Sequence, residues 1–223
     1  MRIIRIFAVT CLLSMCLATF CYAVSYTRLN MMPEVSYGNV AVTSIGRELR
    51  PEQGSILNEV NVDLHEVKIT DNGVVRYKPT YDNAYGWNLS EQYFQVDVTI
   101  NDSLVPAFSK NAFVKITGRD NVSYTVGLYK NRGVSLTVVN NGAITRYFVN
   151  YNIQPYFNYR VCMGGVRGGV MSVTVKKLAT NNTIFEKNID QPNFYDYYLF
   201  DLSVGSNFGL VSVFRNEKIT IVN

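Results

Sequence analysis

The chain is short of the residues that build metal centres and catalytic triads. Its 223 residues include one histidine, His65, one tryptophan, Trp87, and four cysteines. A zinc site would therefore have to rely on carboxylates, which is uncommon, and a Ser-His-Asp triad would have to centre on His65. No Gly-x-Ser-x-Gly motif accompanies this histidine, so we interpret it as a surface residue. We expect no cofactor and assign no metal ligands, and the presence of a calcium site stays open.

The first 23 residues are typical of a cleaved signal peptide. Arg2 and Arg5 precede an apolar run over residues 6–20, and small residues follow at the positions that a signal peptidase inspects, ending at Ala23. The run spans about 15 residues, short of the roughly 20 that a membrane-spanning helix needs. We therefore expect cleavage after Ala23, no membrane span in the mature chain, and a secreted or cell-envelope location, either periplasmic or extracellular.

Loss of this segment changes the composition of the mature protein. It removes Cys11, Cys16 and Cys21, leaves Cys162 as the single thiol, and lowers the basic count from 21 to 19 against 17 acidic residues. The net charge thereby falls from +4 to +2, too little for a nucleic-acid footprint. One thiol excludes intramolecular disulfides and a cysteine-based zinc cluster. A domain of this size buries enough apolar surface to fold without them.

The mature chain divides into an irregular range, 24–57, and a regular one, 58–223. Proline and glycine punctuate the first, at Pro33, Gly38, Gly46, Pro51 and Gly54. We expect it to be an irregular N-terminal arm, in which one short strand stays open. Beyond it, apolar and polar residues alternate with period two, as half-buried strands require. No linker rich in proline, glycine or serine interrupts this second range, so we expect one domain.

The alternating segments predict an all-β fold. They are 60–64, 67–69, 93–100, 112–117, 123–129, 134–139, 144–150, 157–163, 170–176, 197–203, 208–213 and 218–222. Residues 71–73 supply a turn, and Asn141-Gly142 between two alternating runs gives the sharpest hairpin signal. About 12 to 13 short strands, with no substantial helix to connect parallel ones, predict an antiparallel β-sandwich of the jelly-roll type. A barrel is the alternative.

The order of these pieces from residue 93 onward resembles the concanavalin A-like and laminin-G-like β-sandwiches. The matching pieces are an early strand at 93–98, a central strand at 124–128, a hairpin over 159–165 and 173–175, and a closing pair at 208–212 and 219–221. The resemblance implies a jelly-roll sandwich. Other jelly-roll and immunoglobulin-like sandwiches contain similar pieces and stay open as alternatives.

Aromatic residues are the most informative excess, with 16 Tyr and 12 Phe. Several lie in turn-rich segments beside Asn and Asp. Such rings suit sugars, because a ring face stacks on C–H bonds while amides and carboxylates bind hydroxyls, and they suit protein interfaces and the open ends of a sandwich as well. We expect ligand binding by Trp87, Tyr85, Tyr195 and Tyr197, with Arg167, at the tip of a glycine-rich hairpin, contacting a partner.

An enzymatic hypothesis rests on Glu59, Asn61 and Asp63, which alternate on one strand face. They resemble the catalytic string of bacterial β-glucanases with a concanavalin A-like fold, which has acids at all three positions. A retaining glycosidase needs two carboxyls about 5.5 Å apart, but the middle residue here is Asn and no sugar-stacking tryptophans follow. We therefore interpret the string as a solvated strand face. Cys162, on the same face as Arg160, is expected to be partly buried and inert.

These observations favour an exported, non-catalytic binding protein, with a lectin-like, carbohydrate-binding function as the best fit to the loop aromatics. The alternative is a cell-surface structural or protein-binding subunit, an adhesin or assembly component, whose last strand, 218–222, pairs with another chain's edge. A third hypothesis is a glycoside hydrolase of the β-glucanase type, degenerate or active. The expected partner is a carbohydrate or a surface protein and not a nucleic acid, and the oligomeric state stays open.

Overall fold

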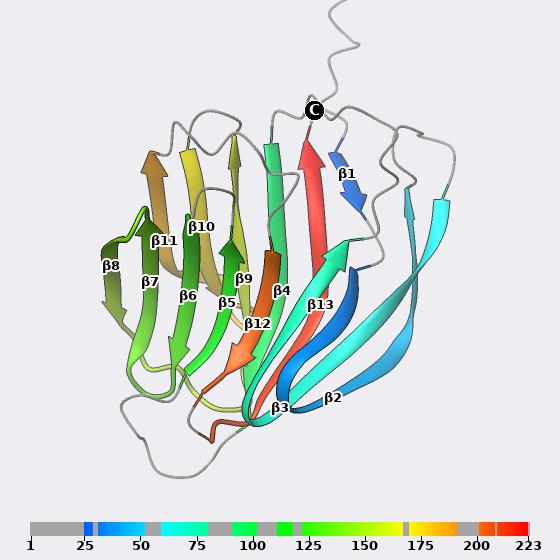
Figure 1. Cartoon of the computed structure of the whole chain (residues 1–223), viewed down its shortest axis with the longest axis horizontal. Helices are drawn as coiled ribbons and strands as arrows, with labels where there is room; N and C mark the ends of the chain where they lie inside the picture. The colour runs from blue at the N-terminus through cyan, green and yellow to red at the C-terminus, as the bar shows by residue number, and fades with distance from the viewer. Residues whose placement is uncertain are drawn as a thin grey trace, which may run out of the picture.

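The computed structural model describes residues 25–28, 31–51, 59–79, 91–101, 111–117, 122–166, 170–190, 201–207 and 209–222. Its regular elements over these ranges are thirteen β-strands, and the strands pair antiparallel (Figure 1). No helix within these ranges is long and apolar enough to cross a membrane. The predicted all-β antiparallel fold is thus confirmed. Residues 1–23, which the sequence predicts to be a signal peptide, lie outside the described residues.

The strands form one continuous sheet that folds into two layers. Their bounds are β1 Ser25–Arg28, β2 Met31–Pro51, β3 Glu59–Pro79, β4 Glu91–Ile100, β5 Asn111–Thr117, β6 Ser123–Tyr129, β7 Gly133–Asn140, β8 Ala143–Asn150, β9 Asn158–Val166, β10 Val170–Lys177, β11 Asn182–Asp190, β12 Asp201–Ser206 and β13 Ser212–Val222. The hydrogen-bonded order is β11-β10-β9-β4-β13-β3-β12-β5-β6-β7-β8, with β1 added to β13 and β2 to β3.

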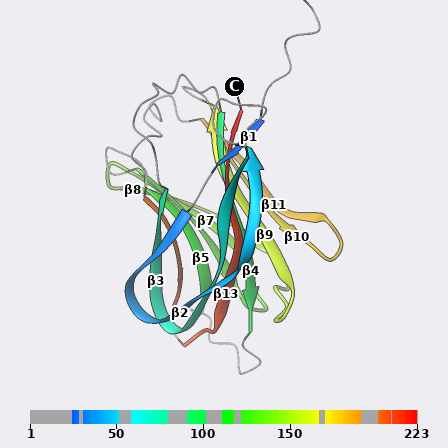
Figure 2. The ribbon, with the colours of Figure 1, turned by 90° about the vertical axis from the view of Figure 1, so that its right-hand side faces the viewer.

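We call β11, β10, β9, β4 and β13 the back sheet, and β12, β5, β6, β7 and β8 the front sheet. In Figure 1 the front sheet lies nearer the viewer, and Figure 2 shows the two layers from the side. Strand β3 joins them, because its residues 67–69 pair with β13 and its residues 73–77 pair with β12. The predicted turn at 71–73 is therefore wrong. These residues lie within β3 at the crossing between layers, where Asp71 has a φ of 81°.

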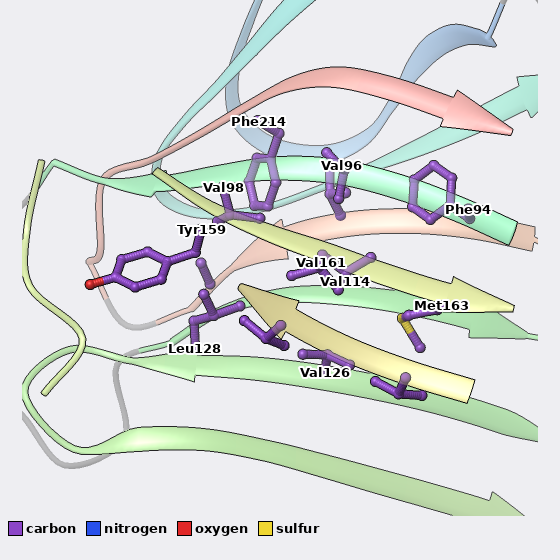
Figure 3. Close-up of a cluster of buried hydrophobic side chains, with 14 of the residues drawn as sticks. Phe94, Val96, Val98, Val114, Val126, Leu128, Tyr159, Val161, Met163 and Phe214 are labelled. Atoms are coloured by element: carbon purple, nitrogen blue, oxygen red, sulfur yellow. The ribbon is translucent and has the colours of Figure 1, made fainter. Parts of the chain in front are cut away.

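The core lies between the two sheets, as Figure 3 shows for a cluster of apolar side chains. Alternate residues point inward, and none of the following is more than 2% exposed: Phe94, Val96, Val98, Val114, Val126, Leu128, Tyr159, Val161, Met163 and Phe214. Full burial of one such side chain stabilises a protein by roughly 1.5–3 kcal/mol. This burial holds the layers together without a covalent link, since Cys162 is a free thiol.

The stretch expected to be an irregular arm contains regular structure, so that expectation is wrong for its described residues. Besides β1 it holds the 21-residue strand β2, which pairs with β3 along its length. Three register shifts interrupt the pairing, and Gly38, with a φ of 95°, and Gly46, with a φ of 142°, lie at two of them. Glycine supports such bulges because it lacks Cβ. These two glycines therefore mark bulges inside a long strand and do not mark loops.

The C-terminal part also differs from the sequence prediction. Segments 208–213 and 218–222 were expected to form two strands, but β13 is one strand with a bulge between Arg215 and Lys218, where Asn216 has a φ of 54°. Strand β11 was not predicted. Phe185 is its one buried apolar side chain, so its sequence lacks the alternation of apolar and polar residues by which the other strands were recognised. The hairpin at Asn141 is confirmed, with positive φ at both turn residues between β7 and β8.

Candidate functional site

The ligand-binding residues predicted from the loops lie outside the described residues. These are Trp87, Tyr85, Tyr195, Tyr197 and Arg167. The glycine-rich segment that contains Arg167 is described on both sides, where β9 ends at Val166 and β10 begins at Val170. The prediction that a strand follows this segment is thus confirmed.

The acidic string on β3 has no catalytic geometry in its described side chains. Asn61 is exposed, and the Asp63 carboxylate accepts a hydrogen bond of 2.8 Å from Arg47 Nε across the β2–β3 pair. The side chain of Arg47 is 71% exposed and that of Asp63 is 43% exposed. Surface ion pairs of this kind contribute roughly 0–1 kcal/mol. Asp63 is therefore part of a cross-strand surface pair.

The lone histidine and the lone thiol lie on different strands. His65 is half-buried opposite Ser44, and its Nδ1 has no hydrogen-bond partner in the described chain. The described ranges contain no group of three or more His, Cys, Asp and Glu side chains that could hold a metal ion. Cys162 is half-buried on the outer side of the back sheet. Burial raises its pKa, which nearby Arg160 and Lys176 partly offset, so the thiol is poorly nucleophilic.

Charged residues on the outer side of the back sheet are paired with one another. Asp97, 5% exposed, accepts hydrogen bonds from Arg160 Nε at 2.8 Å and Nη2 at 3.0 Å, and from Asn216 Nδ2 at 2.9 Å. The hydrogen bonds that Arg160 donates to Asp97 raise the pKa of its guanidinium group. Beside them, Arg215 forms an ion pair of 2.5 Å with Glu66. We interpret this network as structural, because each of its carboxylates is matched by an arginine.

The outer side of β5, β6, β7 and β8 differs from the back sheet and is the candidate site. We call it the front face. Its residues are the positions that alternate with the inward-facing core residues along β5, β6 and β7, together with the residues of β8 that pair with them. The register aligns them in rows across the strands. One row is Phe113, Gly127, Ser135 and Phe148, and the next is Lys115, Thr125, Thr137 and Arg146.

Glycines make room for the aromatic side chains of the front face. A Cβ on Gly205 of β12 would collide with the ring of Phe113, and one on Gly133 would lie 2.9 Å from Phe148 Cζ. Tyr129 and Phe148 meet edge to face with their ring centroids 6.3 Å apart, and Arg132 Cζ lies 5.6 Å from the Phe148 centroid. The rings thus lean onto the sheet surface, and Phe148 is 45% exposed.

Amide and hydroxyl groups border these rings. Asn207 donates from Nδ2 to Asn111 Oδ1 at 3.1 Å, and its backbone N–H donates to the Asn111 carbonyl at the same distance. Asn111 lies directly opposite Tyr129 in the β5–β6 register. Hydroxyls of Thr125 and Thr137 lie on the neighbouring row. The alternation predicts that Thr125 and Thr137 lie on the polar faces of their strands. Asn111 and Asn207 fall outside the predicted segments, and only the strand order brings the four residues together.

The chain matches no protein-family model and no curated protein. A protein of unknown function from Shewanella oneidensis is similar with a TM-score of 0.51 at 13% identity, over 94% of this chain and 92% of that one. Lectin II from Ulex europaeus is similar with a TM-score of 0.50 at 8% identity, over 90% of this chain and 98% of the lectin.

A third match is botulinum neurotoxin type C, described as dependent on two ganglioside molecules for cell entry. It aligns with a TM-score of 0.48 at 13% identity over 88% of this chain and 47% of the toxin chain, so the protein spans about half the length of that structure. The two-layer antiparallel architecture and the full-length matches confirm the resemblance recognised in the sequence. The protein has the concanavalin A-like β-sandwich fold.

Proposed function

We propose that the protein is an exported, non-catalytic protein that binds carbohydrate on its front face. The observation that supports this most directly is the exposed ring of Phe148, which lies against Tyr129 and beside a row of hydroxyls. A pyranose presents C–H bonds to a ring face and hydroxyls to amides and threonines, and the front face offers all of these groups. The residues predicted on the loops remain candidates for additional contacts.

The chemistry of the front face argues against the hypothesis of a glycoside hydrolase and supports this proposal of a binding site. A retaining or inverting glycosidase needs a pair of carboxyl groups flanking the scissile bond. The outward positions of β5, β6, β7 and β8 include no Asp or Glu among their described residues. Export is proposed from residues 1–23, and mass spectrometry of the mature N-terminus tests it, since a chain that starts at residue 24 is expected.

A glycan array followed by calorimetry on the mature protein tests the binding proposal. We expect Phe148→Ala to weaken binding about tenfold, because one aromatic contact is worth roughly 0.5–1.5 kcal/mol beyond the area it buries. Tyr156, 62% exposed on the turn before β9, provides the matched control, and Tyr156→Ala is expected to leave binding unchanged. Equal affinities for the wild type and Phe148→Ala would place the glycan elsewhere.

A second candidate function is binding of a protein at the cell surface. The sequence assigned this role to the last strand, which is wrong, because residues 219–222 are paired on one side with β1 and on the other with β4. The observation that favours this function is the edge strand β2, whose apolar side chains Met32, Tyr37 and Leu49 are 48%, 56% and 58% exposed. Sedimentation tests self-association at this edge, which Leu49→Lys is expected to abolish.

A further inference from the structure

The front face carries positive charge without matching negative charge. Lys115 on β5 and Arg146 on β8 occupy one row, separated by Thr125 and Thr137. Neither cation forms an ion pair or a hydrogen bond with another described residue. On the back sheet, by contrast, Arg160 and Arg215 are each paired with a carboxylate. The row therefore presents two cations that no carboxylate of the described chain neutralises, on the surface that carries the exposed ring of Phe148.

The row has a defined length and composition. Neighbouring strands lie about 4.8 Å apart, so the three steps from β5 to β8 separate the Lys115 and Arg146 backbones by about 14 Å. Towards the other side the row continues through Ser203 of β12 to Arg76 of β3, opposite Glu34 of β2. The stretch between Lys115 and Arg146 therefore presents two cations with two hydroxyls between them.

From this arrangement we propose that the glycan bound by the front face is acidic. The inference rests on the proposed carbohydrate function and adds the chemical class of the ligand. Carboxylate or sulfate groups of an oligosaccharide lying across the strands would bind Lys115 at one end and Arg146 at the other. The sugar hydroxyls between them would bind Thr125 and Thr137, while Phe148 contacts a ring. Charge-assisted hydrogen bonds to carboxylate or sulfate are about twice as strong as neutral ones.

Calorimetry with a matched pair of ligands tests this proposal. The first is a uronic acid oligosaccharide, and the second is the same oligosaccharide after reduction of its carboxyl groups to alcohols. We expect the mature wild-type protein to bind the acidic form at least tenfold more tightly, with an affinity that falls as salt is added. A third measurement uses a sulfated oligosaccharide of neutral sugars and shows whether the surface recognises carboxylate or sulfate groups. Tight binding of either anionic ligand supports the proposal.

Charge variants locate the contact. We expect Lys115→Gln and Arg146→Gln each to weaken binding of the acidic ligand roughly tenfold and to leave binding of the reduced ligand unchanged. Lys68→Gln provides the control, since it removes the same charge from an exposed position on β3, opposite Val213 of the back sheet. Circular dichroism spectra of all variants matching the wild type would show that the sheet is intact.

The outcomes separate this inference from the function on which it rests. If both ligands bind equally and the charge variants have no effect while Phe148→Ala weakens both, the acidic specificity is refuted and carbohydrate binding stands. If polyaspartate or single-stranded DNA competes as well as the acidic glycan, the surface recognises charge alone and the inference fails. If no oligosaccharide binds, both proposals fail.

Discussion

The buried carboxylate of Asp97 is expected to stabilise the back sheet far more than an exposed carboxylate in a similar pair. Asp97 accepts two hydrogen bonds from Arg160 and one from Asn216, and its side chain is 6% exposed. Breaking a buried ion pair from one side costs about 3–5 kcal/mol. Because the Arg160 side chain is 36% exposed and regains water, we expect Asp97→Ala to lower the free energy of unfolding by about 2–3 kcal/mol.

Asp63→Ala is the matched control, since Asp63 also pairs with an arginine across two antiparallel strands but on an exposed hairpin. We expect it to cost at most about 0.5 kcal/mol. For a domain of this size, 2–3 kcal/mol corresponds to a fall in Tm of roughly 5–10 °C. Urea unfolding and calorimetry measure both variants. Losses of equal size for Asp97→Ala and Asp63→Ala would refute the argument that burial sets the contribution of these pairs.

Three further predictions concern individual side chains. Gly205→Ala should destabilise the fold by roughly 1–3 kcal/mol, because its methyl group would collide with the Phe113 ring, and an unchanged urea midpoint would contradict this packing. Cys162, whose pKa burial raises, should react with iodoacetamide near pH 8 much more slowly in the native than in the unfolded protein, as mass spectrometry would show. Burial, and to a lesser degree the charge of Glu217, raises the pKa of Tyr77 well above 10. The stability that burial of the neutral Tyr77 phenol provides is therefore fully present below pH 10, and it is lost as the pH rises through the pKa of the folded state. Tyr77→Phe removes the titrating group, so the variant should lose less stability than the wild type at alkaline pH.

The sequence predicts much of the strand content because one side of most strands faces the core. Strand β6 matches its predicted bounds, and β7 extends its predicted segment by one residue at each end, since the inward Val126, Leu128, Val134 and Leu136 are fully buried. The prediction of strands fails where a strand does not bury every second side chain in the core. Strand β2 is exposed along most of its length, so its glycines and prolines looked like loop punctuation.

The candidate site was harder to predict than the strands. Lys115 and Arg146 are 31 positions apart in the sequence and come to lie in one row of the same face only through the order β5-β6-β7-β8. Period-two alternation reveals that each side chain points away from the core, but it contains no information on which strands pair or in what register. The aromatic signal in the sequence drew attention to the loops, whereas Phe113, Tyr129 and Phe148 were counted as ordinary strand residues.

A difference in ion pairing between the arginines of the two sheets supports placing the function on the front face. Opposite charges facing each other across strands stabilise a sheet, and the back sheet uses this device at Asp97 with Arg160. The same pattern would have been available on the front face, where an acidic residue in place of Thr137 would lie directly opposite Arg146. Threonine there leaves the cation to solvent and supplies a hydroxyl instead. A ligand that brings its own negative charge would pair with Arg146 in place of such an acidic residue.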